Sequence, residues 1–344
     1  MKKFNILMVL IFLVTFTINC STKNNPGKNS NSNFYLASWN IENLFDTIDD
    51  ADKIDEWFLP SSEINWTDDK LNTKLNNLAK VIEFMNNGNG PDILGLQEVE
   101  HGKLIENMLD KITIKKHYKV AHIESPDSRG IDNVLVYNSD LFSLQKSEGL
   151  TVILDDNKTT RDILHCELNY NEIPIHVFVN HWPSRREGLK ESEKNRIAAA
   201  EVLAKRIKEL NKADNSNIII IGDFNDMPSN ISISKVLKAE KIDCDKNSKE
   251  SELLNLSYDL FQKGLGSYKY KDHWNMLDQI IISSSLFDEQ GIDYICESFE
   301  IIKPDFIIQK EGKYAGTPLP TFGGRKYLGG YSDHFPIGAK FSFE

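Results

Sequence analysis

Cysteine is scarce in this sequence, and basic residues are outnumbered by acidic ones. The 4 cysteines include no C-x-x-C pair, so nothing suggests a cysteine-ligated zinc site. Lys and Arg number 40 against 51 Asp and Glu, a net charge of −11, which argues against permanent residence on DNA but allows a transient nucleic-acid substrate. With 40% hydrophobic and 26% charged residues, the composition excludes a disordered chain, a collagen-like repeat and a multi-span membrane protein.

The first residues have the pattern of an export signal. Lys2 and Lys3 precede an apolar run from Ile6 to Ile18, and Cys20 follows it. The run is short for a membrane span, and the pattern resembles a bacterial lipoprotein signal, in which the cysteine is lipidated and becomes the new N-terminus. The residues just before Cys20 depart from that pattern, so ordinary cleavage or an uncleaved anchor remains an alternative. We expect an exported protein, held at the bacterial cell envelope through Cys20 or secreted.

The rest of the chain is predicted to form one domain and to act as a monomer. Residues 21–33, rich in Ser, Asn and Lys, have the composition of a flexible tether between the signal (residues 1–20) and the domain (residues 34–344). Cys166 lies in an apolar, strand-like run and is expected in the core. Export would permit a disulfide between Cys244 and Cys296, but the sequence does not decide whether it forms, so this pairing stays open.

Apolar residues recur with the periods of both helices and strands. Spacings of three and four predict two helices, on Leu71, Leu75, Leu78, Ile82 and Met85 and on Ile197, Ala200, Leu203, Ile207 and Leu210. Strands are predicted at Tyr35–Trp39, Ile93–Leu96, Asn133–Tyr137, Leu150–Leu154, Ile163–Leu168, Ile175–Val179, Ile218–Ile221, Gln279–Ile282 and Ile337–Phe343. So many strands with few intervening helices indicate an α/β fold of packed, mostly antiparallel sheets flanked by helices.

Polar residues concentrate where the predicted strands begin or end. These residues are Asn40, Gln97, Glu98, Asn180, His181, Asp223, Asn225, Asp278, Asp333 and His334. Each alone is more often a turn former, a helix cap or a satisfied core residue. Together they lie beside hydrophobic strands where unpaired charge is costly, so they need one another or a shared cation. Carboxylates and amides with few imidazoles suit Mg²⁺ or Mn²⁺ better than zinc.

Seven short motifs then resemble a known family. They are SWNIENLFD (38–46), LGLQEVE (94–100), RGIDNVLVYN (129–138), VNHWPSR (179–185), IIGDFND (220–226), LDQIIIS (277–283) and YSDHFPI (331–337). In this order they are similar to the successive motifs of the endonuclease/exonuclease/phosphatase superfamily. The resemblance implies a four-layer α/β sandwich, with two central, mostly antiparallel β-sheets flanked by helices and the active site at one end of the sheets.

The resemblance also implies roles for individual residues. Glu98 matches the principal ligand of a divalent metal, Mg²⁺ with Mn²⁺ or Ca²⁺ as alternatives, and Asn40 and Asp333 match positions beside it. The resemblance places Asp223 and Asn225 at the attacking water, Asp278 and His334 in a His–Asp dyad, and His181 on the scissile phosphate. Either Asp223 or His334 could activate the water. Trp182 departs from many nucleases of the family, which leaves the substrate-facing wall open.

Arginines near these motifs could bind phosphate. Arg129 and Arg185 are the main candidates, with Arg161 and Arg186 as further ones, because a guanidinium gives bidentate, permanently charged contacts. The alternative for each is a solvated side chain. Trp182 could stack on a base or sugar, or else pack at the rim of the site. The glycine-rich residues 321–331 lack a P-loop pattern and are expected to form a loop or hairpin.

These observations predict an exported, divalent-metal-dependent phosphodiesterase, with nucleic acid as the favoured substrate. Hydrolysis of inositol phosphates or of sphingomyelin uses the same chemistry and remains the alternative. A catalytically inactive binding module is a third possibility, disfavoured because every expected catalytic position is present. Fold resemblance alone does not decide among these functions.

Overall fold

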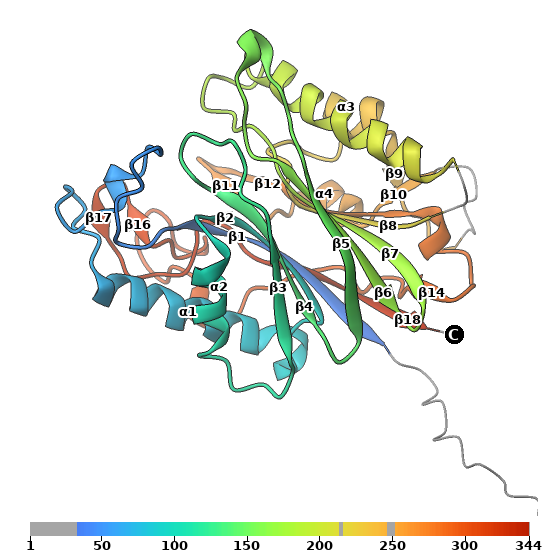
Figure 1. Cartoon of the computed structure of the whole chain (residues 1–344), viewed down its shortest axis with the longest axis horizontal. Helices are drawn as coiled ribbons and strands as arrows, with labels where there is room; N and C mark the ends of the chain where they lie inside the picture. The colour runs from blue at the N-terminus through green and yellow to red at the C-terminus, as the bar shows by residue number, and fades with distance from the viewer. Residues whose placement is uncertain (1–32, 213–215, 246–251, 344) are drawn as a thin grey trace, which may run out of the picture. The chain divides into compact units, whose positions relative to one another are not determined.

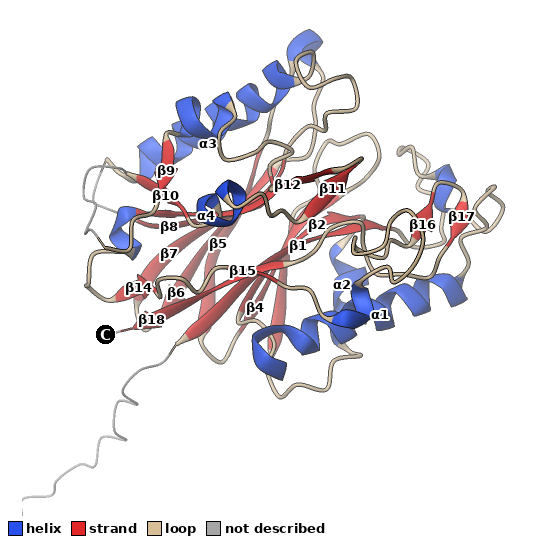
Figure 2. Ribbon diagram, turned by 180° about the vertical axis from the view of Figure 1, so that it is seen from behind, coloured by secondary structure: helices blue, strands red, loops and turns tan. Residues whose placement is uncertain are grey.

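The computed structural model describes residues 33–343 except 213–215 and 246–251, and two seven-stranded β-sheets form its centre (Figure 1). The predicted signal and nearly all of the predicted tether fall in residues 1–32, outside the described residues. Helices cover the outer face of each sheet (Figure 2), so the predicted four-layer α/β sandwich is confirmed. No helix within the described ranges is long and apolar enough to cross a membrane.

The first sheet has the strand order β14-β18-β1-β2-β4-β3, with β15 paired to β18. Its only parallel pair is β1–β2. Its strands are β1 (Phe34–Leu44), β2 (Ile93–Val99), β3 (Tyr118–His122), β4 (Asp132–Asn138), β14 (Ile292–Tyr294), β15 (Glu300–Ile301) and β18 (Ile337–Phe343).

The second sheet has the order β5-β6-β7-β8-β13-β10-β9, in which β7–β8 and β9–β10 are parallel and the other pairs antiparallel. Its strands are β5 (Phe142–Leu150), β6 (Ile163–Tyr170), β7 (Ile173–His181), β8 (Asn217–Asp223), β9 (Ala239–Lys241), β10 (Leu253–Asn255) and β13 (Asp278–Ser283). Two separate hairpins are β11 (Tyr268–Tyr270) with β12 (His273–Asn275) and β16 (Phe322–Gly323) with β17 (Lys326–Tyr327). The second of these confirms the hairpin expected in residues 321–331.

Alternation along the strands explains the layers. In β1, Phe34 and Leu36 belong to the core between the sheets, whereas Tyr35 and Trp39 belong to the core beneath the helices of the first sheet. Successive side chains of a strand point to opposite faces, so a strand buried on both faces reads as a continuous apolar run. Burying one such large side chain contributes about 1.5–3 kcal/mol. These cores therefore hold the strand ends, and the site they carry, in place.

The helices lie where their apolar faces predict. Helices α1 (Asp68–Gly88) and α2 (Gly102–Leu109) pack on the first sheet, and α3 (Glu193–Leu210) packs on the second, which agrees with both predicted helices. Helix α4 (Tyr258–Gln262) is short. Single turns of other helix types are η1 (Glu56–Phe58), η2 (Asp155–Asn157), η3 (Ser232–Leu237), η4 (Ser284–Leu286) and η5 (Asp305–Ile307).

One prediction of local structure is wrong. The predicted strand Leu150–Leu154 is replaced by β5, which ends at Leu150. The sequence of β5 is largely polar because much of this edge strand is exposed. Cys244 and Cys296, whose pairing the sequence analysis left open, form a disulfide. The bridge joins segments that follow β9 and β14, the edge strands of the two sheets, and no sequence spacing reveals that proximity. Cys166 is buried in the core as expected.

Candidate active site

The predicted site residues gather at one end of the two sheets. Since β1–β2 and β7–β8 are parallel, the carboxyl ends of these neighbours coincide. In register, His181 lies beside Asp223, and Asp223 lies beside Asp278 at the start of β13. Asn40 joins the two sheets, because its Nδ2 donates to Glu98 Oε1 at 3.2 Å and to Asp223 Oδ2 at 3.1 Å. Carboxylates, an amide and an imidazole from both sheets therefore face one another.

Irregular backbone turns Glu98 into this site. The residue has φ = +65°, and the register of β2 on β4 shifts around it, between Gln97 and Val99. Positive φ is uncommon outside glycine, and such irregularities re-aim side chains. Glu98 Oε2 accepts the backbone N–H of Asn43 at 2.8 Å, which fixes the carboxylate and leaves Oε1 facing Asn40 and the centre of the site.

Asp333 and Glu98 fit a divalent cation, whereas Asn40 does not present a ligand oxygen. Burial raises the pKa of Asp333, His334 opposes this effect, and the nearby Glu98 carboxylate raises the pKa further. Two carboxylates that repel each other in a buried site suit a hard cation such as Mg²⁺. Asn40 turns its NH₂ group to the carboxylates while its Oδ1 accepts the Glu42 N–H at 3.0 Å. In this arrangement Asn40 orients Glu98 and Asp223 through its NH₂ group.

Asp223 is placed to accept a proton. Its Oδ1 accepts the backbone N–H of Asn225 at 2.8 Å, and its Oδ2 accepts hydrogen bonds from Asn40 and, at 3.4 Å, from Asn225 Nδ2. Burial raises the pKa of Asp223 to about 6, and although His334 opposes the shift, Asp278 adds to it. A carboxylate with a pKa near the working pH is still ionised at neutral pH and more basic than an ordinary aspartate.

His334 and Asp278 form the predicted dyad. The His334 Nδ1 and Asp278 Oδ2 are 2.7 Å apart, and the Ser267 hydroxyl donates to the same carboxylate oxygen. Burial alone would lower the pKa of His334, but attraction to Asp278, Asp333 and Asp223 outweighs it and raises the pKa well above its ordinary value. This shift favours the imidazolium form of His334, so Asp223 is better suited than His334 to activate water.

The pKa of His181 is shifted in the opposite direction from that of His334. Burial lowers its pKa well below the ordinary value, and the positive charges of Arg161, Arg129 and His334 lower it further. Its Nε2 lies 3.7 Å from Glu98 Oε1 and 3.8 Å from Asp223 Oδ2, and its buried Nδ1 has no hydrogen-bond partner within the described part of the chain. We assign the neutral tautomer with Nε2–H facing the site, where this group can donate a hydrogen bond to a phosphate oxygen.

The predicted substrate contacts are only partly placed at the site. The Trp182 ring is buried and packs against Phe224, so it cannot stack on a substrate. The Arg185 guanidinium is turned toward the loop that follows β8, where it donates to the Asn225 carbonyl and pairs with Asp226 at 3.3 Å. Arg185 therefore supports this loop instead of binding phosphate. Arg129, whose side chain is 37% exposed, is the most accessible of the three predicted substrate contacts.

Two residues that the sequence analysis missed, Lys74 and Glu42, support the segment that carries Asp333. The buried Lys74 of α1 donates to the Glu42 carbonyl at 2.7 Å, to the Thr321 hydroxyl and to the Tyr331 carbonyl at 3.2 Å. Burial raises the pKa of Glu42 to about 7; Lys74 opposes this shift, and Asp333 adds to it. In the sequence, Glu42 could have been suspected only from its position two residues after Asn40. Nothing marks Lys74, because a lysine within a helix pattern does not reveal its partner.

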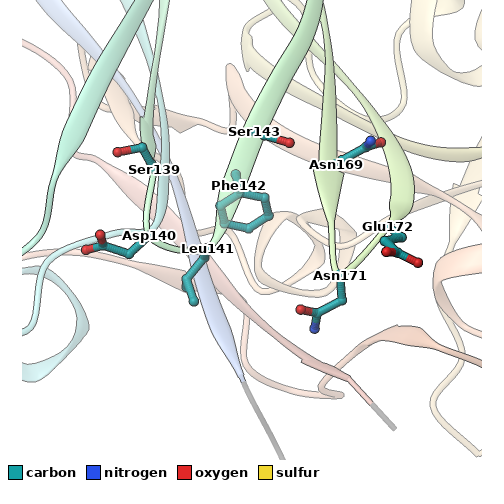
Figure 3. Close-up of a pocket in the computed structure, with 8 residues that line it drawn as sticks. All are labelled: Ser139, Asp140, Leu141, Phe142, Ser143, Asn169, Asn171 and Glu172. Carbon is teal, nitrogen blue, oxygen red and sulfur yellow. The ribbon is translucent and has the colours of Figure 1, made fainter. Parts of the chain in front are cut away.

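A surface hollow lies at the opposite end of the sheets. About 240 Å³ in volume, it is lined by the turns that follow β4 and β6 (Figure 3). Its side chains come from Ser139, Asp140, Leu141, Phe142, Ser143, Asn169, Asn171 and Glu172. It includes no imidazole and no basic group, so it is not a competing site for phosphate chemistry.

A model of the endonuclease/exonuclease/phosphatase family matches residues 35–342, and the chain belongs to this family. Its members are hydrolases that act on phosphoester bonds and generally depend on a divalent metal. No curated protein matches the sequence.

Solved structures share the fold at low sequence identity. The chain resembles a D. rerio TDP2 humanized by 14 mutations (14% identity, TM-score 0.55, covering 90% of this chain and 98% of that one). It also resembles the mannosyl-6-phosphatase Bt3783 of Bacteroides thetaiotaomicron (14% identity, TM-score 0.58, 90% and 100% covered). The human Nocturnin catalytic domain with bound sulfate is a third (18% identity, TM-score 0.54, 91% and 95% covered).

Proposed function

We propose that the protein is a divalent-metal-dependent phosphodiesterase that cleaves nucleic acid outside the cytoplasm. The observation that carries the catalytic part is the placement of the His334 ring 3.9 Å from the Asp223 carboxylate, beside the Glu98 and Asp333 carboxylates, with the pKa of both groups raised. One group can accept a proton while its neighbour stabilises negative charge. Phosphoester hydrolysis by an activated water needs both.

The residues act on a phosphate as follows. Asp223 Oδ2 accepts a proton from the attacking water, and the Asn225 amide helps to position that carboxylate. Cationic His334 stabilises the charge that develops on the phosphoryl oxygens, and Asp278 holds its ring. His181 donates a hydrogen bond from Nε2. A metal held by Glu98 and Asp333 would neutralise phosphoryl charge and assist departure of the alkoxide. No covalent intermediate is required.

The β11–β12 hairpin favours a nucleic-acid substrate. Tyr268 forms an isolated bridge with His334, and their rings are 4.7 Å apart, so the hairpin borders the catalytic histidine. Beyond it the chain reads Lys269, Tyr270, Lys271 and, after an aspartate, His273, and the Tyr270 ring is 58% exposed. Exposed aromatic rings interleaved with lysines are typical of surfaces that stack bases and follow a phosphate backbone.

Removing this hairpin surface should weaken nucleic-acid binding without disabling the catalytic groups. For the triple variant Lys269→Gln, Tyr270→Ala, Lys271→Gln, we expect KM for a single-stranded DNA oligonucleotide to rise about tenfold, with a shallower salt dependence, because stacking and counterion release are lost. The kcat on bis-p-nitrophenyl phosphate should be unchanged. The pair Lys313→Gln, Tyr314→Ala is a matched control, since Lys313 also lies over a tyrosine ring, at 5.5 Å. Equal KM changes in both variants would contradict the assignment.

A phosphatase acting on a small phosphate ester is the second candidate. Its support is the inward placement of Trp182 and Arg185, which removes two of the three predicted substrate contacts. A small ester needs fewer contacts than a polynucleotide. Hydrolysis of sugar phosphates and inositol phosphates, with no action on DNA or RNA and little response to salt, would favour this candidate and leave the metal chemistry standing.

We further propose that the protein is anchored to the bacterial cell envelope through a lipidated Cys20. The support is the sequence pattern around that residue, which lies outside the described part of the chain. Wild-type protein should partition into the detergent phase of a membrane extract, whereas Cys20→Ser should be released or remain unprocessed. A Cys166→Ser variant controls for loss of a thiol elsewhere. Equal partitioning of wild type and Cys20→Ser would support ordinary secretion.

A further inference from the structure

Two lysines lie against one tryptophan ring at the border of the active site. The Nζ of Lys303 is 4.9 Å from the centre of the Trp274 ring, and the Nζ of Lys269 is 5.5 Å from it. Lys269 and Trp274 are cross-strand partners in the β11–β12 hairpin, whereas Lys303 follows β15. Segments far apart in the chain therefore bring two positive charges to one ring.

The tryptophan and the two lysines border the catalytic groups without entering among them. The Trp274 ring stacks on that of Phe335, with the ring centres 5.8 Å apart, and Phe335 directly follows His334 in the chain. Successive side chains of a strand point to opposite faces, so Lys269 points away from the face on which the Tyr268 ring lies beside His334. The lysines therefore lie where a part of the substrate next to the reacting group would pass.

The positive charges of these two lysines are not balanced by carboxylates. Within the described residues, no Asp or Glu forms an ion pair with Lys269 or Lys303, whereas Lys116 and Lys241 each pair with an aspartate. Lys303 is half-buried, and burial lowers its pKa without a nearby carboxylate to oppose the shift. The aromatic rings attract the ammonium groups but carry no net charge. An anion bound to both lysines would offset their mutual repulsion and the cost of burial.

We propose that Lys269 and Lys303 bind a second phosphate of the substrate, one that neighbours the phosphate being hydrolysed. The inference rests on the proposed nucleic-acid substrate and deepens it, because a polynucleotide carries further phosphates on either side of the scissile one. Several charged oxygens let one phosphate accept a charge-assisted hydrogen bond from each ammonium group. Cation–π contact with Trp274 holds the two lysine side chains in place. A substrate with a single phosphate leaves this subsite unused.

The test compares ligands that carry one phosphate or two. Isothermal titration calorimetry with Mg²⁺ present would measure binding of thymidine 3′,5′-bisphosphate and of the 3′- and 5′-monophosphates to full-chain Asp223→Asn protein, in which turnover is prevented. The bisphosphate should bind about tenfold more tightly than either monophosphate, the scale of added hydrogen bonds between charged groups. Adding Lys303→Gln or, separately, Lys269→Gln should remove most of this gain and leave monophosphate binding unchanged. Lys303→Arg, which keeps the charge, should retain the gain.

Lys80→Gln is the matched control, because Lys80 of α1 also lies over an aromatic ring, that of Phe306, at 4.2 Å. It should leave the gain unchanged. Equal binding of the bisphosphate and the monophosphates by the Asp223→Asn protein, or an undiminished gain in both glutamine variants, would overturn the subsite. A gain for inositol 1,4-bisphosphate over inositol 1-phosphate, with none for the nucleotide, would overturn it as well. Failure of the proposed function would appear separately, as wild-type protein that does not cleave a DNA oligonucleotide.

Discussion

Replacing His334 by alanine should lower kcat for phosphodiester hydrolysis by about 10²-fold or more, the scale of a general acid–base or charge-stabilising group. The substitution removes the imidazolium that lies 3.9 Å from Asp223 Oδ2. The measurement is steady-state kinetics on an oligonucleotide and on bis-p-nitrophenyl phosphate, since both reactions use the same catalytic groups. His122→Ala is a matched control. His122 also pairs with an aspartate, Asp132, at 2.8 Å, but it takes no part in the proposed chemistry.

Asp278→Asn should reproduce much of the His334 effect and add a change in pH dependence. Asp278 is the strongest contributor that raises the pKa of His334. If the imidazolium of His334 is required, activity falls as the pH rises through the pKa of His334. Loss of the Asp278 carboxylate lowers this pKa. The alkaline fall in kcat should therefore move to lower pH in Asp278→Asn. An unchanged alkaline limb, or wild-type kcat in His334→Ala, would contradict the role given to this dyad.

Glu98→Gln should have the largest effect of any single substitution, about 10³-fold or more in kcat at saturating Mg²⁺. Glutamine preserves the shape of the side chain and can still accept the Asn43 N–H, but it removes the charge that holds the cation, and metal stabilisation of the transition state amounts to several kcal/mol. Kinetics over a range of Mg²⁺ concentrations separate weak metal binding from lost catalysis. Glu106→Gln, on the exposed side of α2, is the control, and equal activity of the two variants would remove Glu98 from the mechanism.

The sequence predicts the fold well where side-chain periodicity carries the information. Strands buried on both faces, such as the one containing Ile218–Ile221, are continuous apolar runs and were located correctly. The edge strand β5 was missed because much of it is exposed and therefore polar. The Cys244–Cys296 disulfide could not be decided from the sequence because it connects the edges of different sheets, and only the tertiary fold brings them together.

The candidate site was predictable in membership but less so in orientation. Strand-end positions identified Glu98, Asp223 and His334 because parallel neighbours carry their ends to one place. The direction of a side chain depends on local partners that the sequence does not reveal. Trp182 turns inward because Phe224 and the Asn180 amide accommodate its ring, and Arg185 turns inward toward Asp226. Motif position alone could not separate these inward residues from substrate contacts.

Metal removal and restoration test the central claim most directly. Purified full-chain protein would be treated with EDTA, dialysed and assayed for hydrolysis of a single-stranded DNA oligonucleotide and of bis-p-nitrophenyl phosphate before and after Mg²⁺ is added. We predict no measurable hydrolysis of either substrate without metal, recovery of both activities with Mg²⁺ in the wild type, and no recovery in Glu98→Gln. Undiminished hydrolysis by the wild type in EDTA would contradict the proposal that Glu98 and Asp333 hold an essential cation.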